Sequence, residues 1–520
     1  MYSENDRRKS RTVSGALRIV AAVAALILAL LLAGCGNDSN GSSSGKDRSD
    51  REESVRFKTP EEQYRYVEGA VLEKMGAGLA GAFDDALQSS SLTDQKVDAE
   101  MTLELFEPAE QMLETYTGMD FSWLRTLGLK AGVNLTEDGA AAELSLSLNG
   151  RELIGADALV DIAQMTVYGR VPRLSKDYFQ TELDAWTLYN SGYPVMRQQQ
   201  ETMSALLPDG KTVSKLISRC VEAALEQVDD VEEGSETLTA GDVSAKYTTL
   251  TWTLTEDLLQ DMAEAVCDVL KEDKDVKDII EKIEEMQGLS FYDEFIEELE
   301  DLPDRIRMDE DIEITVYVDK NNAVRGRVIE VGDIVFRYAM PEDDGDFGFE
   351  LAIEDARDGE IFCLLTGEGK ERKNTIEGTF TFEMDETELF TLSVEDFDTE
   401  ALGDGELIGT FTFKPTYDLY TRAGVYSLTA RTLEEFSLAL ELGRNDMALT
   451  VYMGDEPFAS LTERVERGRA ERLPDISDAK DVTSWARSLM LSGALDEYVN
   501  YLKGSDIPEE LLRQLLGAAF

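Results

Sequence analysis

The chain has 520 residues, 42% of them hydrophobic and 8% aromatic, which is enough for two to four domains with a substantial core. Its 106 acidic and 50 basic residues give a formal net charge of −56, which repels nucleic acid and anionic membranes and favours basic partners. The chain contains no histidine. This excludes Ser-His-Asp and Cys-His nucleophile systems, His-ligated zinc and a histidine general base, but not carboxylate, lysine, tyrosine or serine–lysine chemistry.

The first 34 residues have the pattern of a secretory signal peptide. Basic residues dominate positions 1–18, and an uncharged, mostly apolar run follows over positions 19–34. A helix of that run reaches about 24 Å, less than the roughly 30 Å of a bilayer's hydrocarbon core. A basic start, a short apolar run and small residues at its end predict export and cleavage rather than a membrane-spanning helix.

Leu32-Ala33-Gly34-Cys35 resembles the lipobox of bacterial lipoproteins. The resemblance implies cleavage between Gly34 and Cys35, and a thioether-linked diacylglycerol on Cys35. The mature chain would then be a lipoprotein on the extracytoplasmic face of the cell membrane. The alternatives are an ordinary signal peptide with a chance cysteine, or an uncleaved anchor. Residues 35–56, rich in glycine, serine and charge, are predicted to form a flexible tether.

The segment 57–200 is predicted to contain a helix followed by an antiparallel meander. Thr59, Pro60 and Glu62 form a capping-box pattern, which starts a helix that we expect to end near residue 87. Apolar residues then alternate over residues 127–135 and 144–148, and Asn149-Gly150 is the strongest short hairpin signal. Residues 97–170 are therefore predicted to form an antiparallel meander of paired strands.

The segment 201–305 is predicted to be mainly helical, with one strand at residues 243–254. Its apolar residues recur at i, i+3 and i+4, and acidic residues occupy the outer faces. Cys220 and Cys267 lie on apolar helix faces, where we interpret them as small core residues. The alternative is a Cys220–Cys267 disulfide, which would leave Cys363 free.

The segment 306–470 returns to long strands with one apolar face, and residues 471–520 are predicted to form C-terminal helices. The pentapeptide GTFTF occurs at residues 378–382 and again at 409–413, which indicates two similar strands. We therefore predict an α+β fold with a large curved antiparallel sheet packed against helices, arranged as one sheet or as two half-barrel-like units.

Two acidic clusters are candidate calcium sites, because carboxylates around a glycine supply the oxygen ligands that Ca²⁺ requires. Neither cluster has the EF-hand spacing, and chance clustering in so acidic a chain is the alternative. No other cofactor is expected. The first cluster surrounds Gly345 and contains Glu342, Asp343, Asp344 and Asp346. The second contains Asp396, Asp398, Glu400 and Asp404.

Aromatic residues on the predicted strands are candidates for the lining of an apolar pocket. The alternative is that they fill the core. The set comprises Phe336, Phe347, Phe380, Phe382, Phe411 and Phe413.

The order of signal peptide, lipobox, tether and helix-flanked sheet resembles the half-barrel lipoproteins, such as the periplasmic lipoprotein carrier and its mycobacterial lipid-binding relatives. It is also similar to long surface lipoproteins of anaerobic Gram-positive bacteria. The resemblance implies a curved sheet around apolar helices and transfers no functional residue beyond Cys35. We expect a non-enzymatic protein that binds an apolar ligand or an envelope partner. The alternatives are a transporter's solute-binding component, with two parallel-sheet lobes, and a glycan hydrolase with two carboxylates about 5–9 Å apart.

Overall fold

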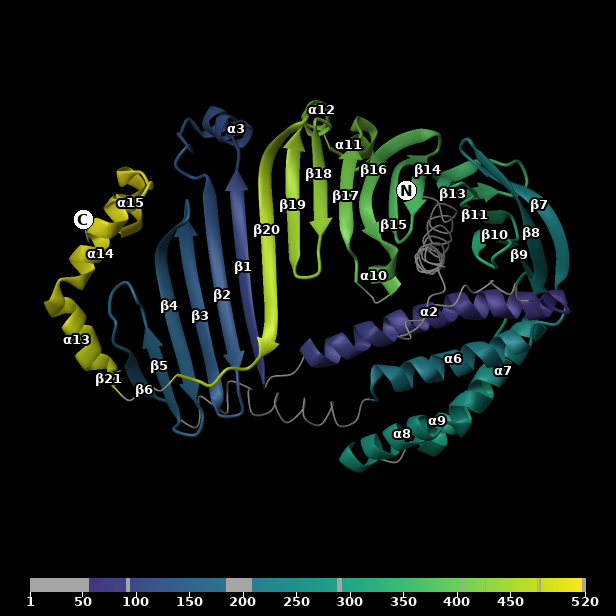
Figure 1. The fold of residues 1–520 in the computed structure, drawn as a ribbon, viewed down its shortest axis with the longest axis horizontal. Helices are drawn as coiled ribbons and strands as arrows, with labels where there is room; N and C mark the ends of the chain where they lie inside the picture. Colours follow the sequence, from purple (N-terminus) through teal and green to yellow (C-terminus); the bar gives the residue numbers. More distant parts are fainter. Residues whose placement is uncertain are drawn as a thin grey trace, which may run out of the picture. The chain divides into compact units, whose positions relative to one another are not determined.

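The fold is α+β, with a large and mostly antiparallel sheet packed against helices, as predicted (Figure 1). The computed structural model describes residues 56–89, 94–183, 208–287, 292–403, 406–425, 427–474, 476 and 478–516. Gly34, Cys35 and all of the tether except its last residue lie outside these residues. Within the described part of the chain, no helix is both long enough and apolar enough to span a membrane.

The chain divides into two compact units, each built from two separate stretches of sequence. Unit 1 combines residues 1–85 with 206–408, and unit 2 combines residues 86–205 with 409–520. Both units are discontinuous in sequence, whereas the predicted segments are contiguous. The two GTFTF strands accordingly fall in different units, at β15 and β17.

Unit 1 contains nine consecutive antiparallel strands in the order β7-β8-β9-β10-β11-β13-β14-β15-β16, with the short β12 paired to β13. Its strands are β7 (Glu232–Ala240), β8 (Val243–Leu254), β9 (Ile312–Val318), β10 (Val324–Val331), β11 (Ile334–Ala339), β12 (Glu342–Asp343), β13 (Asp346–Asp355), β14 (Ile361–Arg372), β15 (Thr375–Met384) and β16 (Thr387–Asp398). Its helices are α2 (Pro60–Ser89), α6 (Gly210–Glu226), α7 (Glu256–Glu272), α8 (Lys274–Gln287), α9 (Tyr292–Arg305) and α10 (Thr399–Gly403).

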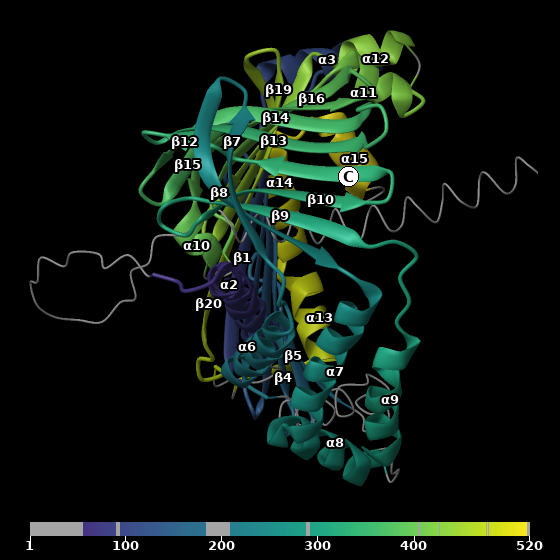
Figure 2. The ribbon, with the colours of Figure 1, turned by 90° about the vertical axis from the view of Figure 1, so that its right-hand side faces the viewer.

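Helices α2, α6 and α7 lie against one face of the unit 1 sheet, over β8, β9 and β10 (Figures 1 and 2). The predicted cap starts α2, since the Glu62 N–H donates to Thr59 Oγ1 over 3.3 Å. The main core cluster joins apolar residues of these helices to Leu250 and Val316, both fully buried. Burial of this apolar area provides the principal stabilisation of unit 1.

A buried ion pair lies within this helix–sheet interface. Glu68 on α2 is 4% exposed, and its Oε1 is 2.9 Å from Nη1 of Arg327 on β10. Tyr64, one helical turn earlier, is also buried, and burial raises its pKa well above the usual range. Removing two charges from water is costly, so the pair is tolerable only while both partners are present.

The second face of the unit 1 sheet is partly covered by β7, which the sequence analysis did not predict. Leu238 and Ala240 of β7 pack with Tyr247 and Tyr317 in a separate cluster. The close approach of β7 to β13 requires a glycine at position 348 of β13, because a Cβ there would collide with the Ala240 carbonyl oxygen of β7. Most other side chains of β7 are exposed, so its sequence lacks the apolar alternation of a half-buried strand.

Unit 2 has the strand order β17-β18-β19-β20-β1-β2-β3-β4-β5-β6-β21, antiparallel except for β6 with β21. Its strands are β1 (Gln95–Leu105), β2 (Thr126–Leu135), β3 (Gly139–Leu148), β4 (Arg151–Asp161), β5 (Thr166–Arg170), β6 (Phe179–Glu182), β17 (Gly409–Pro415), β18 (Phe436–Leu442), β19 (Asp446–Met453), β20 (Glu456–Arg469) and β21 (Lys480–Asp481). Its helices are α3 (Glu107–Thr117), α11 (Tyr417–Arg422), α12 (Ser427–Leu433), α13 (Val482–Ser492), α14 (Ala494–Lys503) and α15 (Glu509–Leu516).

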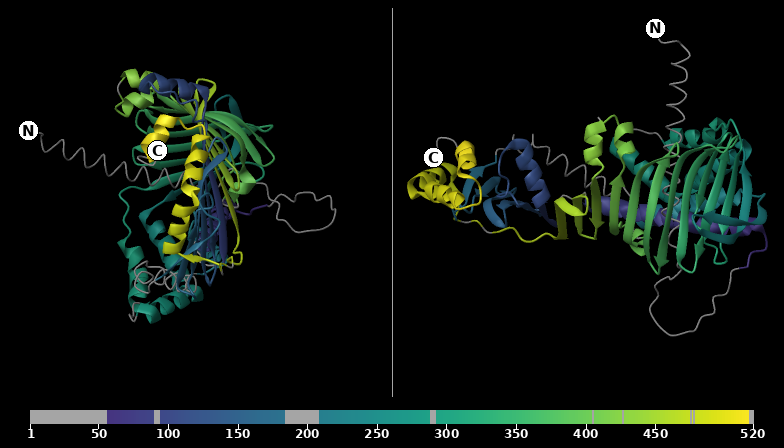
Figure 3. Two further views of the ribbon diagram at one scale, coloured as in Figure 1. Left: turned by 90° about the vertical axis from the view of Figure 1, so that its left-hand side faces the viewer. Right: turned by 90° about the horizontal axis from the view of Figure 1, so that it is seen from above.

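The meander β1–β5 is confirmed, and α3 interrupts it between β1 and β2. Asn149 and Gly150 form the turn between β3 and β4 with φ values of 50° and 75°, as the Asn-Gly signal predicts. The C-terminal helices lie at the β6 end of the sheet (Figure 3). Leu502 and Leu512 pack there against Leu148 and Leu153 in a small core.

Candidate functional site

The acidic cluster around Gly345 forms a charged hairpin. Asp344 and Gly345 make the two-residue turn between β12 and β13, with positive φ at both positions. Glu342 pairs with Arg325, and Asp346 Oδ1 is 3.1 Å from Nζ of Lys370. Two of the four predicted ligands are therefore already neutralised by basic side chains.

The second acidic cluster stabilises local backbone structure. Asp396 has φ 52° beside a register shift between β15 and β16. The Asp398 carboxylate accepts the backbone N–H groups of Glu400 and Ala401, at 2.9 and 3.0 Å, at the start of α10. Asp404 lies outside the described residues. In the described ranges, no three or more cysteine, aspartate and glutamate side chains are grouped so that they could hold a metal ion.

The six phenylalanines are divided between the two units. Phe347 is 1% exposed, and its ring lies over Gly369, where a Cβ would come within 2.5 Å of Cζ. Phe380 lies over Gly367 in the same way, and Phe382 stacks on Phe390 with ring centroids 5.1 Å apart. Phe336 is buried on β11, whereas Phe411 and Phe413 lie on β17 of unit 2. In unit 1, Phe347 and Phe380 therefore pack over glycines of the sheet.

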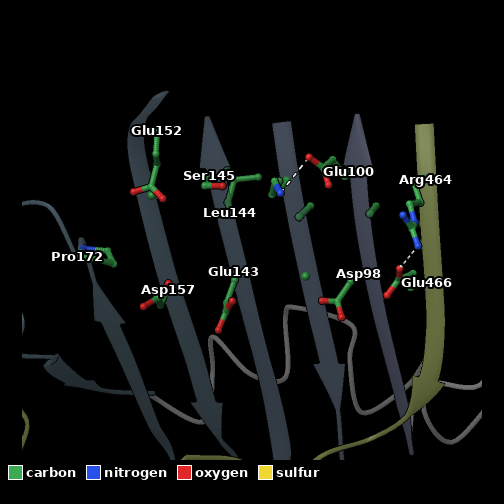
Figure 4. Close-up of a pocket in the computed structure, with 15 residues that line it drawn as sticks. Asp98, Glu100, Glu143, Leu144, Ser145, Glu152, Asp157, Pro172, Arg464 and Glu466 are labelled. Atoms are coloured by element: carbon green, nitrogen blue, oxygen red, sulfur yellow. Dashed lines mark ion pairs between the residues drawn. The ribbon is translucent and has the colours of Figure 1, made fainter. Parts of the chain in front are cut away.

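The structure contains a polar groove on one face of the unit 2 sheet that the sequence analysis did not identify (Figure 4). It has a volume of about 440 Å³ and extends across β20, β1, β2, β3 and β4. Gly132 and Gly155 are part of its floor. A Cβ on Gly132 would lie 2.8 Å from Asp98 Oδ1, so glycine leaves room for that carboxylate to fold over the sheet.

One row of residues across the groove is dominated by carboxylates, here called the carboxylate row. Strand register places four carboxylates in one line across the sheet, with Gly132 between Asp98 and Glu143. Figure 4 shows the four carboxylates side by side. Neighbouring strands are about 4.8 Å apart, and like charges directly opposite each other are unfavourable. The row consists of Glu466, Asp98, Glu143 and Asp157.

Basic side chains compensate most of the groove's acidic residues. Lys130 Nζ is 2.9 Å from Glu100 Oε1, Arg464 Nη2 is 2.8 Å from Glu466 Oε1, and Arg170 pairs with Asp157. Glu143 has no ion-pair partner among the described residues. The groove is therefore suited to attract one further cationic group.

Two groove residues that could carry acid–base chemistry are held in ion pairs. Lys130 and Ser145 lie directly opposite each other, and the Lys130 ammonium is bound to Glu100. Asp157 is bound to Arg170. Beside it, burial raises the pKa of Tyr178, whose ring lies 4.5 Å from the Arg170 guanidinium carbon.

The opposite side of the same sheet carries an open surface, here called the apolar face. Five of its large side chains, from four adjacent strands, are between 39% and 52% exposed. Cross-strand register places Met101, Leu129, Leu146 and Ile154 in one row. The five exposed side chains are Met101, Leu129, Val133, Leu144 and Ile154.

The apolar face continues across the strands of the second chain stretch. One row of partly exposed residues crosses six neighbouring strands about 4.8 Å apart, which gives a length of about 24 Å. Phe413 pairs with Leu438, which is 38% exposed, so the phenylalanines of β17 belong to this face. The next residue in register, Leu148, is buried beneath the C-terminal helices. The row consists of Phe411, Leu440, Leu449, Leu461, Leu103 and Leu127.

Both surfaces depend on strand register, which explains why sequence reasoning did not assemble them. The alternation in β2 and β3 was evident, but alternation does not indicate which strands are neighbours or whether a face is covered. The pairing of β1 with β20 joins residues more than 350 positions apart. Comparison with protein-family models, curated proteins and solved structures finds no match for this chain.

Proposed function

We propose that this chain is a lipid-anchored, extracytoplasmic, non-enzymatic protein that binds an envelope protein through the apolar face of unit 2. The lipobox at Leu32-Ala33-Gly34-Cys35 supports the anchor. The exposure of Met101, Leu129, Val133, Leu144 and Ile154 on one sheet face carries the binding part of the proposal. Large contiguous apolar patches on a soluble surface mark interaction sites, because leaving them in water is unfavourable.

The shape of the apolar face favours a protein partner over an enclosed lipid. Small-molecule sites are concave and bury most of the ligand surface. The apolar face is instead a broad sheet surface, about 24 Å along its longest row and about 20 Å across, or roughly 500 Å². That is more than half of the roughly 800 Å² that each partner contributes to a standard protein interface.

The alternative functions receive less support. A transporter's solute-binding component needs parallel sheets in two lobes, and the pairings described here are antiparallel except for β6 with β21. A glycan hydrolase needs a protonated carboxyl beside an ionised one, whereas Asp157 in the groove is paired with Arg170. The proposal involves no cofactor and no nucleic acid, and the net charge of −56 favours a basic rim on the partner.

A site-specific photo-crosslinker tests the proposal in the native membrane. We expect a crosslinker in place of Leu144 to give a protein adduct of one discrete mass. The matched control replaces Ser145, the next residue on the same strand, whose side chain points to the opposite side of the sheet because side chains alternate along a strand. Both residues border the groove, so only the direction of the side chain differs. Equal adducts at both positions, or a phospholipid adduct at Leu144, would overturn the assignment of a protein partner to this face.

The anchor is tested separately by Cys35→Ser. We expect this variant to stay unprocessed or to be released from the membrane, because the modified thiol would be lost. Normal processing and membrane retention would rule out lipidation at Cys35. This outcome is independent of the crosslinking result, so the two parts of the proposal fail separately.

A further inference from the structure

The corner between α13 and α14 carries strongly exposed apolar side chains. Met490 and Leu491 are 78% and 80% exposed, and Leu495 is 47% exposed. Gly493 ends α13 in the left-handed conformation, with φ 75°, and α14 begins at the next residue. These apolar side chains therefore lie at a projecting turn between two helices.

The inner side of α13 fixes this corner in place. Leu489 is buried, and the Trp485 indole N–H donates to the Asp177 carbonyl oxygen over 3.1 Å. The Trp485 ring also contacts Phe179 on β6, with centroids 4.9 Å apart. Because this side of α13 is held against unit 2, the exposure of Met490 and Leu491 is a property of the folded corner.

The charge around the corner differs from that of the whole chain. About one residue in five is acidic, 106 of 520, yet residues 482–495 contain no acidic residue and one basic residue, Arg487. Arg487 is exposed on the same helix as Met490. Asp481 and Asp496 bound this stretch. The corner can therefore approach an anionic surface with less repulsion than the rest of the molecule, and Arg487 complements such a surface.

We propose that the α13–α14 corner inserts Met490 and Leu491 into the surface of the bilayer that carries the chain, with Arg487 at the lipid headgroups. The proposal rests on the lipid anchor of the proposed function and not on its protein partner. A bilayer accepts a small convex apolar wedge without a shaped pocket, whereas a protein interface needs a broader complementary area. Anchoring keeps the corner close to the bilayer, so a weak insertion becomes significant.

Depth-dependent fluorescence quenching tests this proposal with the full, lipidated chain. Met490→Trp is reconstituted into vesicles of phosphatidylcholine and phosphatidylglycerol that carry bromine on their acyl chains. The matched control is Met119→Trp, at a position of unit 2 that is 54% exposed. After subtraction of the native tryptophan signal, we expect the added tryptophan at 490 to be quenched at least twofold more than that at 119.

Equal quenching at the two positions would overturn the proposal, including the case in which the corner contacts a protein instead. A second variant, Leu491→Asp, should lower the quenching of Met490→Trp while leaving the crosslink at Leu144 unchanged. Retained quenching in the presence of Leu491→Asp would count against insertion of the corner. A missing Leu144 crosslink in a chain whose Met490→Trp is still quenched would count against the proposed partner surface alone. A chain that fails to float with the vesicles at all would contradict the lipid anchor, and the corner proposal with it.

Discussion

Units 1 and 2 contain similar antiparallel sheets whose apolar faces have different surroundings. In unit 1, α2, α6 and α7 cover β8, β9 and β10, and Leu250 and Val316 are fully buried. In unit 2, β1 to β4 have the same kind of apolar alternation, yet Leu144 is 52% exposed. A covered face stabilises the fold, whereas an open face of the same composition is available for binding. Substitutions should therefore have large effects on stability in unit 1 and small effects in unit 2.

The largest difference is expected for charged pairs. Glu68→Gln in unit 1 would leave Arg327 charged and buried, so the free energy of unfolding should fall by about 3–5 kcal/mol. Glu100→Gln in unit 2 removes an exposed pair with Lys130 and should cost at most about 1 kcal/mol. Urea denaturation of the two variants measures both values. Equal losses would contradict the contrast between the buried helix–sheet interface of unit 1 and the exposed groove of unit 2.

Matched leucines provide the next test. Leu250→Ala in unit 1 removes a fully buried side chain, and we expect a loss of about 2–5 kcal/mol. Leu144→Ala in unit 2 starts from a half-exposed side chain and should cost less than about 1 kcal/mol. The comparison uses midpoints and slopes from the same urea titration. A loss at Leu144 as large as that at Leu250 would show that the apolar face is covered within the free protein.

Glycine substitutions should show a smaller difference. A Cβ at Gly369 would lie 2.5 Å from Phe347 Cζ, so Gly369→Ala should lower the free energy of unfolding by about 1–3 kcal/mol. Gly468 on β20 has no atom within 4 Å of the corresponding point, and Gly468→Ala should change stability by about 0.5 kcal/mol or less. Thermal unfolding of the two variants measures the difference, and a neutral Gly369→Ala would refute the packing of Phe347 over the sheet.

The last expected effect is pH-dependent and belongs to unit 1. Burial, together with a 3.0 Å hydrogen bond from the Tyr317 hydroxyl to Glu236, raises the pKa of Tyr317 to about 12. The unfolded chain releases this proton near its ordinary value of about 10, so the stabilisation is complete below pH 10 and is lost as the pH rises towards 12. Tyr317→Phe should reduce the decline in stability over this interval. An unchanged decline would show that Tyr317 does not contribute.

Local signals in the sequence predicted local structure well. Thr59 and Pro60 marked the start of α2, and Asn149-Gly150 marked the β3–β4 turn, because caps and tight turns depend on a few adjacent residues. The strand β7 was missed, since few of its side chains are buried. The α+β class was predicted because strand and helix periods differ clearly.

The candidate surfaces could not be predicted in the same way. The carboxylate row brings Glu466 into line with Asp98 through the β1–β20 pairing, and no short-range signal specifies that register. The apolar face has the same alternation as a buried strand, so sequence alone indicates a core there. Of the earlier candidates, Phe411 and Phe413 do lie on this face, although they were expected in a pocket with four residues of unit 1.

The most direct test of the central claim is the affinity of the captured partner for two single variants. Leu144→Asp places a charge among the exposed side chains of the apolar face, whereas Ser145→Asp places it on the opposite, polar side of the same strand. We predict that Leu144→Asp raises the dissociation constant at least tenfold, equivalent to about 1.4 kcal/mol, and that Ser145→Asp changes it less than twofold. Equal effects of the two variants, or no effect of Leu144→Asp, would contradict binding through this face.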